Sequence, residues 1–328
     1  MLSKLRGRKW TPQQRAVLIT VVAVVMGALF VTTYSLALGD PVPHDIKAAL
    51  VGDPASSPRT VAAVEKVANN RLTFERYSSL PDALNAISHQ NVYAALDLDS
   101  STPTLYIASA AGASVARVLE KVYAVDPQVR VTDTHPLASD DPAGLDIFYL
   151  MLVGTIVGMV TVFQVRGAAP GLALRHHIRF VLGLAVLAST VLTLVDGPLL
   201  HRPAALYPQE WAILTAHLIA VSSFASLMAV AVGAWAVVPT WLFFVILGNA
   251  SSGGAVAPPL LPQPFAFLSQ WLPSGATVGA LRNAIYFRDY QQARPLVVLG
   301  VWAAGLFAAW IFLARRRAAR AIPAATGT

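Results

Sequence analysis

Long apolar runs alternate with polar segments along this chain of 328 residues. A helix needs roughly 20 mostly apolar residues to cross the hydrocarbon of a membrane. The run 211–249 is too long for one crossing and suits two, with a turn near Gly233 and Pro239. Further runs of spanning length or slightly less lie at 16–38, 147–165, 178–195 and 295–314. The pattern therefore predicts a polytopic α-helical membrane protein with six transmembrane helices.

The first apolar run has two interpretations. Ala37 and Gly39 form a small-x-small pattern typical of a signal-peptide cleavage site. However, the run 16–38 is longer than the apolar core of an ordinary signal peptide, which has roughly 7–15 residues. We therefore favour an uncleaved membrane anchor.

A polar segment at 39–146 separates the first two predicted spans. Its short apolar stretches alternate between strand and helix patterns. This order predicts one inserted α/β or α+β domain of about a hundred residues, large enough to have its own core. The expected strands are 46–52, 72–78, 92–99, 104–110 and 128–134, and the expected helices are 60–70, 81–90 and 113–125.

Composition supports the membrane assignment. Hydrophobic residues make up 55% of the chain and charged residues only 12%, with a mean hydropathy of +0.58. About a quarter of the residues of a soluble domain are charged. The alanine-rich composition, with more arginine than lysine, is typical of a high-GC bacterium.

The distribution of charge predicts the orientation. The predicted N-terminal segment 1–15, the loop after the second span and the tail 315–328 contain arginine and lysine but no acid. All 17 acidic residues fall in the other half of the topology. Positive loops face the cytoplasm, so we expect a multi-pass protein of the bacterial cytoplasmic membrane with both termini inside and the 39–146 domain outside. The arginines are then expected to contact lipid headgroups rather than nucleic acid.

The chain offers little enzyme chemistry. It has no cysteine and no phosphate-binding G-x-x-x-x-G-K-[ST] loop, and its histidines lack metal-ligand spacing. Asp97 and Asp99 share one face of a predicted strand, where they could bind a cation or form the solvated side of an edge strand. The second alternative is the commoner one. We therefore predict no enzyme activity, no cofactor and no metal.

An irregular segment interrupts the last third of the chain. Glycines and prolines at 248–264 stop the fifth span, and Pro273 to Gly275 divide the next apolar piece into halves too short to cross a bilayer. Irregular backbone at that depth must be buried in protein or line a cavity. We expect a re-entrant hairpin at 250–290 in the outer leaflet. Arg282 on its second half would anchor at headgroups or pair with a carboxylate, and we favour the anchor.

This segment resembles the phage infection protein (Pip)-like branch of the ABC-2-type transporter permease superfamily. The remaining plan is also similar: one span, a large external domain, then five spans (147–314) with a hairpin before the last. The residues that carry the resemblance are Gly248, Asn249, Ser251, Ser252, Gly253, Gly254, Pro258, Trp271, Leu272, Pro273, Gly275 and Ala276, with Arg282 on the second half of the same hairpin.

The resemblance implies the membrane subunit of an exporter, working as a homodimer with a separate ATPase. The loop 166–179, which has Arg175, His176, His177 and Arg179, would face that ATPase. A hydrophobic or lipid-like substrate is expected. The alternative is a non-transporting scaffold or receptor whose external domain binds an envelope partner.

Polar and small residues within the spans are further candidates. His217 lies in the fourth span, either as a functional ionisable group or as a neutral histidine hydrogen-bonded inside the bundle. Gly154 and Gly158 form a G-x-x-x-G pattern that permits close helix contact. Asp196 and Glu210 flank an outer loop and are expected at the membrane interface.

Overall fold

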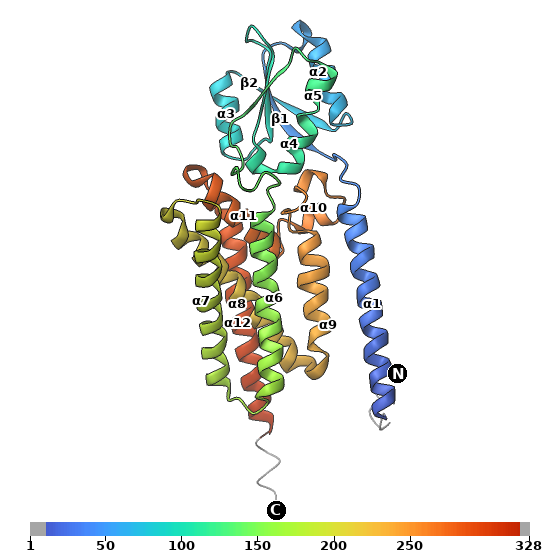
Figure 1. Ribbon diagram of the computed structural model, residues 1–328, viewed down its shortest axis with the longest axis vertical. Helices are drawn as coiled ribbons and strands as arrows, with labels where there is room; N and C mark the ends of the chain where they lie inside the picture. Colours follow the sequence, from blue (N-terminus) through green and yellow to red (C-terminus); the bar gives the residue numbers. More distant parts are fainter. Residues whose placement is uncertain (1–10, 322–328) are drawn as a thin grey trace, which may run out of the picture.

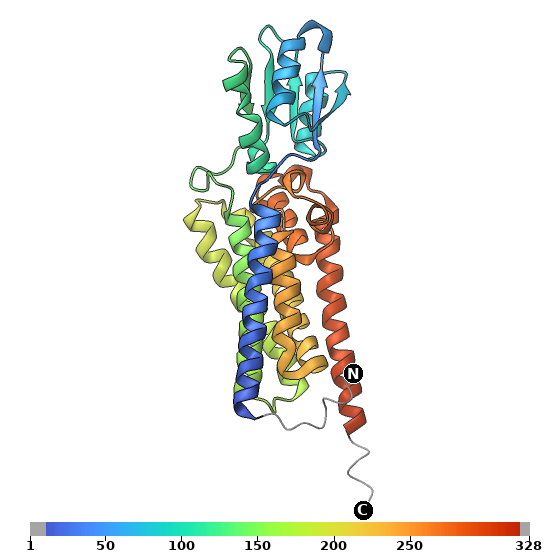
Figure 2. The same ribbon diagram turned by 90° about the vertical axis from the view of Figure 1, so that its right-hand side faces the viewer.

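The computed structural model describes residues 11–321 and has two parts. A bundle of long helices forms one part, and a small α/β domain stands on one end of it (Figure 1). We call that end of the bundle the domain end and the other the far end. The N-terminal helix begins and the C-terminal helix finishes at the far end, as Figures 1 and 2 show.

Five helical stretches are long and apolar enough to cross a membrane, so the chain is a polytopic helical membrane protein. Four are single helices, and the fifth is a stretch of 46 residues, Ala204–Asn249. The single helices are α1 (Pro12–Leu38), α6 (Asp146–Ala168), α7 (Leu174–Leu199) and α12 (Ala293–Ala321).

The 46-residue stretch turns back on itself and makes two passes. Helix α8 (Tyr207–Val232) ends at a 3-10 turn, Gly233–Ala236, where Gly233 has φ +66°. The chain returns as α9 (Val237–Thr240) and a π-helical segment, Trp241–Asn249. The rings of Phe224 and Phe243 stack 4.9 Å apart across the two arms. The turn is thus at Gly233, as predicted, whereas Pro239 lies inside α9, and the chain crosses the length of the bundle six times.

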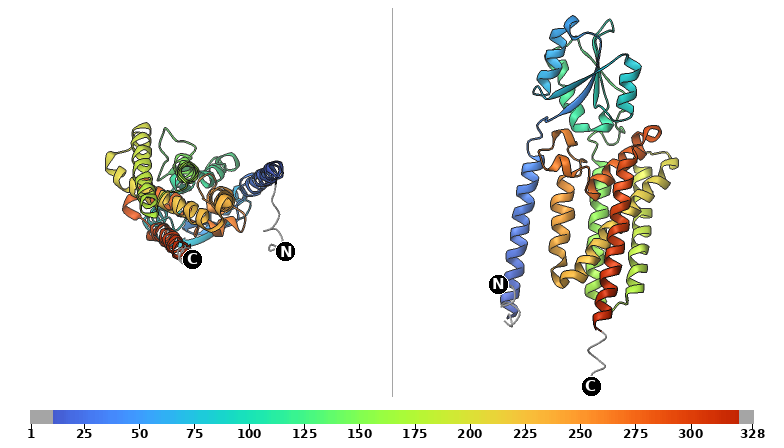
Figure 3. Two further views of the ribbon diagram at one scale, coloured as in Figure 1. Left: turned by 90° about the horizontal axis from the view of Figure 1, so that it is seen from below. Right: turned by 180° about the vertical axis from the view of Figure 1, so that it is seen from behind.

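Helix α1 lies apart from the other helices, as the views from below and behind show (Figure 3). Its main neighbour is the π-helical segment, where the Tyr34 hydroxyl donates to the Val245 carbonyl at 3.3 Å. Apolar side chains such as Val24, 66% exposed, point away from the protein along most of its length. A helix this apolar and this exposed requires lipid around it.

The α/β domain is built on a five-stranded sheet with strand order β2-β1-β3-β4-β5. Its pairs are parallel except β3 with β4. The strands are β1 (Ile46–Val51), β2 (Leu72–Tyr77), β3 (Ala94–Asp97), β4 (Thr104–Ile107) and β5 (Arg130–Asp133). The helices are α2 (Pro58–Val67), α3 (Leu80–Ser88), α4 (Ala113–Leu119) and α5 (Val122–Val125), so the helix expected at 113–125 is two short ones.

The edge-strand interpretation of Asp97 and Asp99 is wrong. Strand β3 lies at the centre of the sheet, and Asp97 is only 3% exposed. Its Oδ1 accepts a hydrogen bond from the Asp99 amide at 3.0 Å. In residues 11–321 no group of three or more His, Asp or Glu could hold a metal ion. Asp97 therefore ends its strand with a local turn.

The 250–290 segment joins the two parts of the molecule. It leaves the π-helical segment, passes through a 3-10 turn (Pro258–Leu260) and α10 (Phe265–Leu268), and returns as α11 (Pro273–Tyr286). Val256 and Leu260 pack into the core on one face of the sheet, and Phe287 packs into the core on the other. The segment therefore contacts both faces of the domain's base.

Between these two domain contacts the segment enters the bundle. Helix α11 is buried along most of its length and packs against α6, α8 and α12. The Thr277 hydroxyl lies 2.9 Å from His217 Nδ1 on α8. At about 1.5 Å per residue, His217 lies about 15 Å along α8 from Tyr207. The path thus runs from the domain into the bundle and back.

Phe287 is 1% exposed and its ring stacks on His135 of the domain, with centroids 4.8 Å apart. We expect Phe287→Ala to lower the free energy of unfolding by about 3–5 kcal/mol, because it leaves a cavity between the domain and the bundle. Thermal unfolding of the purified protein in detergent measures the loss. Phe267→Ala, on the same segment but 57% exposed, is the matched control and should change stability by at most about 0.5 kcal/mol. Equal effects of the two variants would contradict the packing described here.

The same contact predicts a pH dependence. Burial lowers the pKa of the His135 imidazole below its ordinary value, against the opposing effect of the Asp133 carboxylate. As the pH falls through about 6.5, the unfolded chain binds a proton before the native imidazole does, so stability is lost down to the native pKa. We expect His135→Phe, which keeps an aromatic ring there, to lose less thermal stability than the wild type on acidification from about pH 7.5 to about pH 5.5. Identical pH profiles would refute this role of His135.

Candidate functional site

A cleft of about 460 Å³ opens between the α/β domain and the domain end of the bundle. Its walls come from residues 90–93 of the domain, from the 250–290 segment and from the start of α12. A volume of this size is typical of small-molecule sites. The charged residues in its walls are Lys47, Arg282 and Arg294, and no acidic residue lines it in the described part of the chain.

Most of the residues that carry the family resemblance gather at or near this cleft. Ser252, Pro258, Gly275, Ala276 and Arg282 line it. Gly253 and Gly254 line a small enclosed cavity that Arg282 also borders. The remaining residues line neither space. Trp271 is exposed, and the others are buried: Gly248, Asn249, Ser251, Leu272 and Pro273. The interrupted sequence therefore contributes one wall of the cleft and part of the small cavity beside Arg282.

The backbone geometry of the 250–290 segment requires glycine at two positions. Gly253 has φ +72°, a left-handed conformation that other residues rarely adopt. A Cβ on Gly275 would lie 1.9 Å from the Ser269 carbonyl oxygen, so no larger residue fits at the first turn of α11. Both permit the sharp changes of direction that bring the segment back into the bundle.

Arg282 neither reaches the lipid-facing surface nor pairs with a carboxylate. It is half-buried between domain and bundle, and its Nη2 donates to the Gly253 carbonyl at 2.9 Å. No acidic side chain forms an ion pair with it among residues 11–321. The sequence identified this residue correctly as notable, but its setting depends on the domain that covers it.

Two unpaired polar side chains are buried close in sequence to residues that line the cleft. The Asn249 side-chain amide and the Ser274 hydroxyl are buried, and neither has a hydrogen-bond partner among the described residues. Gly248 and Ser274 lie against each other, since a Cβ on Gly248 would be 2.6 Å from the Ser274 hydroxyl. Buried polar groups without partners cost about 1–3 kcal/mol each, so they point to a polar environment inside the bundle.

His217 is hydrogen-bonded inside the bundle, the second of the two alternatives. It is fully buried, and its Nε2 lies 3.0 Å from the Thr155 hydroxyl and 3.1 Å from the Met151 carbonyl. With Thr277 on the other ring nitrogen, it connects α6, α8 and α11. Gly154 allows this approach, because a Cβ there would lie 3.0 Å from the imidazole Cδ2.

The possible ATPase-facing residues lie at the far end. The loop between α6 and α7 spans only residues 169–173, and α7 begins at Leu174. Arg175, His176 and Arg179 are exposed there. His177 instead turns inward, with its ring 5.0 Å from that of Trp310 on α12. Three of the four residues are therefore free to meet another molecule.

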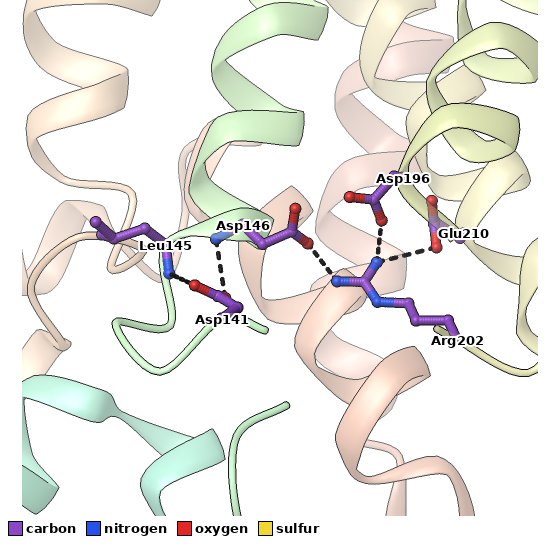
Figure 4. A network of polar contacts seen from close by, with 6 residues as sticks. All are labelled: Asp141, Leu145, Asp146, Asp196, Arg202 and Glu210. Carbon is purple, nitrogen blue, oxygen red and sulfur yellow. Dashed lines mark hydrogen bonds and ion pairs between the residues drawn. The ribbon is translucent and has the colours of Figure 1, made fainter. Parts of the chain in front are cut away.

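The sequence missed a buried ionic cluster at the domain end (Figure 4). Arg202, in the loop between α7 and α8, contacts Asp146 of α6 through Nη2 and Asp196 of α7 through Nη1. Its Nη1 also lies 3.2 Å from Glu210 Oε2 of α8. Asp141 accepts from the Leu145 and Asp146 amides at 3.0 and 3.1 Å and caps α6. Asp196 and Glu210, which were expected at the membrane interface, are buried in the protein and paired with Arg202 at the domain end of the bundle.

The cluster ties three helices together through one cation. Burial opposes the charge on Arg202, but the three carboxylates outweigh it, and the pKa of the guanidinium lies above its ordinary value. Arg202 therefore stays charged. The sequence did contain a signal for this cluster, because Arg202 lies between Asp196 and Glu210 in a short stretch that joins two apolar helices. That Asp146 joins them depends on helix packing.

Removing the cation should be costly. We expect Arg202→Met to lower the free energy of unfolding by about 3–5 kcal/mol, because it leaves two buried carboxylates and the partly buried Asp146 without a positive partner. Thermal unfolding in detergent measures this, with Arg288→Met, at an exposed arginine of the same end, as the control. Adding Asp196→Asn and Glu210→Gln to Arg202→Met should recover part of the loss. A single Arg202→Met variant as stable as the control would contradict the cluster's role.

Comparison with protein-family models, curated proteins and solved structures gave no match to this chain. The resemblance to the ABC-2-type permease superfamily consequently stays a hypothesis carried by the residues of the 250–290 segment.

Proposed function

We propose that this chain is the membrane subunit of an exporter for a hydrophobic or lipid-like substrate, driven by a separate ATPase. In this proposal it lies in a bacterial cytoplasmic membrane as a homodimer, and its partners are membrane lipid, a second copy of itself and the ATPase.

 The α/β domain faces the outside, both termini face the cytoplasm, and the 250–290 segment is a re-entrant hairpin of the outer leaflet. No nucleic acid takes part.

The distribution of charge supports this orientation. All 17 acidic residues lie in the α/β domain or at the domain end of the bundle. The far end carries only basic charges in the described part of the chain, and a cytoplasmic face enriched in arginine is the usual arrangement. These residues are Arg15, Arg166, Arg175, Arg179, Arg315, Arg316, Arg317 and Arg320. The lysines and arginines of residues 1–10 lie outside the described residues.

The observation that carries the proposal is the cleft, together with unpaired polar groups that are buried close in sequence to residues of its wall. A passive anchor has no need of buried, unsatisfied groups such as Asn249 and Ser274 inside its bundle. Polar groups inside a membrane bundle are tolerated where they are paired or line a water-filled cavity, so unpaired ones favour a polar path through the bundle. The segment above them is irregular and enters the bundle from the domain end, where a moving element would open a route outward.

An apolar groove at the far end favours a lipid-like substrate. It has a volume of about 700 Å³ and lies between α1 and the returning arm of the helical hairpin. Leu18, Val22 and Trp241 are among its apolar walls, and Arg15 stands at one end. An apolar groove with one cation suits an acyl chain with a polar head.

The scaffold or receptor alternative is favoured by a different feature. Tyr123 and Val125 of α5 are exposed on the α/β domain, at 64% and 38%. The domain is held firmly on the bundle by the 250–290 segment, so it presents this surface in a fixed position. A partner protein of the envelope would bind there without any transport.

Affinity purification of the full chain in mild detergent tests the proposal. We expect an ATP-binding subunit to co-purify. The double variant Arg175→Glu with Arg179→Glu should reduce its recovery by roughly tenfold, because reversing both charges removes the attraction between these arginines and acidic groups of the ATPase. Arg288→Glu, at the domain end, is the control. We also expect Pro273→Leu to abolish the ATPase activity of the complex while leaving the complex assembled.

Repeated absence of an ATP-binding partner would overturn the exporter and leave the scaffold alternative.

The orientation of the chain is checked by labelling intact cells that produce it. The chain has no cysteine, so a single cysteine at the exposed Ser100 or Gly171 reports which side of the membrane each end faces. If a thiol reagent that does not cross the membrane labelled the Gly171→Cys variant from outside the cell, the proposed orientation would be wrong.

A further inference from the structure

The cleft between the domain and the bundle is positively charged. Lys47, Arg282 and Arg294 line it, and none of its described lining residues is acidic. This is notable because every acidic residue of the chain lies at this end of the molecule or in the domain above it. The acids are placed elsewhere, as the pairing of Asp146, Asp196 and Glu210 with Arg202 shows. The cleft therefore keeps its positive charge.

Arg282 contributes a charge that forms no ion pair with any acidic side chain among residues 11–321. It donates one hydrogen bond to the Gly253 carbonyl, which leaves further N–H donors of its guanidinium without a described partner. The aromatic residues near its guanidinium, Tyr93 and Tyr286, are phenols without a charge. A half-buried arginine without an acid is costly, so an anion in the cleft would gain the full attraction.

Arg294 is aimed by an aromatic contact instead of an acid. Its guanidinium lies over the ring of Trp271, with 4.7 Å to the ring centroid. Trp271 itself is 49% exposed, and the nearby Phe267 is 57% exposed. Exposed aromatic residues of this kind gather where a membrane protein meets the headgroup layer. Lys47 is the weakest of the three cations, because its Nζ lies 3.1 Å from Glu75 Oε1.

We propose that this cleft binds a phosphate group, carried either by a lipid headgroup or by a small water-soluble molecule. Arginine is the residue best suited to phosphate, because its planar set of donors matches two phosphate oxygens at once. The neutral side chains of Gln90 and Asn283 also line the cleft, and Gln90 Nε2 donates to Asn283 Oδ1 at 2.7 Å. The site holds whether or not the chain exports a substrate.

Binding is measured on the full-length protein purified in an alkyl maltoside, a detergent without phosphate. One arm adds inorganic phosphate, and the other adds short-chain phosphatidylglycerol, each at ionic strength matched with sodium chloride. The readout is the shift of the unfolding temperature with ligand concentration, which gives a Kd. We expect Arg282→Gln and Arg294→Gln each to weaken binding by about 10- to 100-fold, the range for one charge-assisted hydrogen-bonded contact.

The control is Arg288→Gln, because Arg288 is exposed at the same end but does not line the cleft. Its Kd should match that of the wild type. Since Arg282 is half-buried, Arg282→Gln also tests folding, and Arg294→Gln, at an exposed position, decides the matter if the first variant does not fold. A response to phosphate assigns a soluble ligand, and a response to phosphatidylglycerol alone assigns a lipid headgroup.

Two results would overturn the proposal. The first is the absence of any shift with either probe in the wild type. The second is an equal Kd for the wild type, Arg294→Gln and Arg288→Gln, which would place binding outside the cleft. Neither result depends on whether an ATPase co-purifies. A failure to bind phosphate would therefore not contradict the proposed export function, which the co-purification experiment tests separately.

Discussion

The packing of the 250–290 segment between the α/β domain and the helix bundle is the contact on which the remaining architecture depends. Val256 and Leu260 enter the core on one face of the sheet and Phe287 enters the core on the other. Between them, α11 lies buried among α6, α8 and α12. Burying side chains of this size contributes about 1.5–3 kcal/mol each, so the segment fixes the domain on the bundle instead of leaving it on flexible linkers.

The same segment explains why polar groups collect at one end of the molecule. By covering the bundle from the domain side, it forms one wall of the cleft. Arg282 lines that cleft, and the unpaired Asn249 and Ser274 are buried close in sequence to other residues of its wall. The Arg202 cluster, close by at the ends of α6, α7 and α8, holds its three acids in ion pairs. The described walls of the cleft thus carry cations and no acidic residue, while the three acids close by share one cation.

These arrangements bear on the proposed functions in different ways. Export requires that the segment move, and a helix joined to both parts would transmit such a movement from the bundle to the domain. Binding of a phosphate group requires only the static cleft. The link between them is chemical: a lipid-like molecule with a phosphate head fits both the apolar groove beside α1 and the cationic cleft. The two spaces lie at opposite ends of the bundle, so one molecule would not occupy both at once.

The sequence by itself determined the membrane class, the apolar runs that form the long helices, the order of strands and helices in the domain, and the place where the helical pattern is interrupted. These follow from local properties: apolar length, period and the positions of glycine and proline. Only the tertiary structure decided what surrounds each polar residue. Asp97 proved to be on a central strand, Asp196 and Glu210 proved to be buried, and Arg282 proved to have no acid partner. The reason is physical: strand order and helix packing bring together residues far apart in the chain, and a linear pattern carries no record of those neighbours.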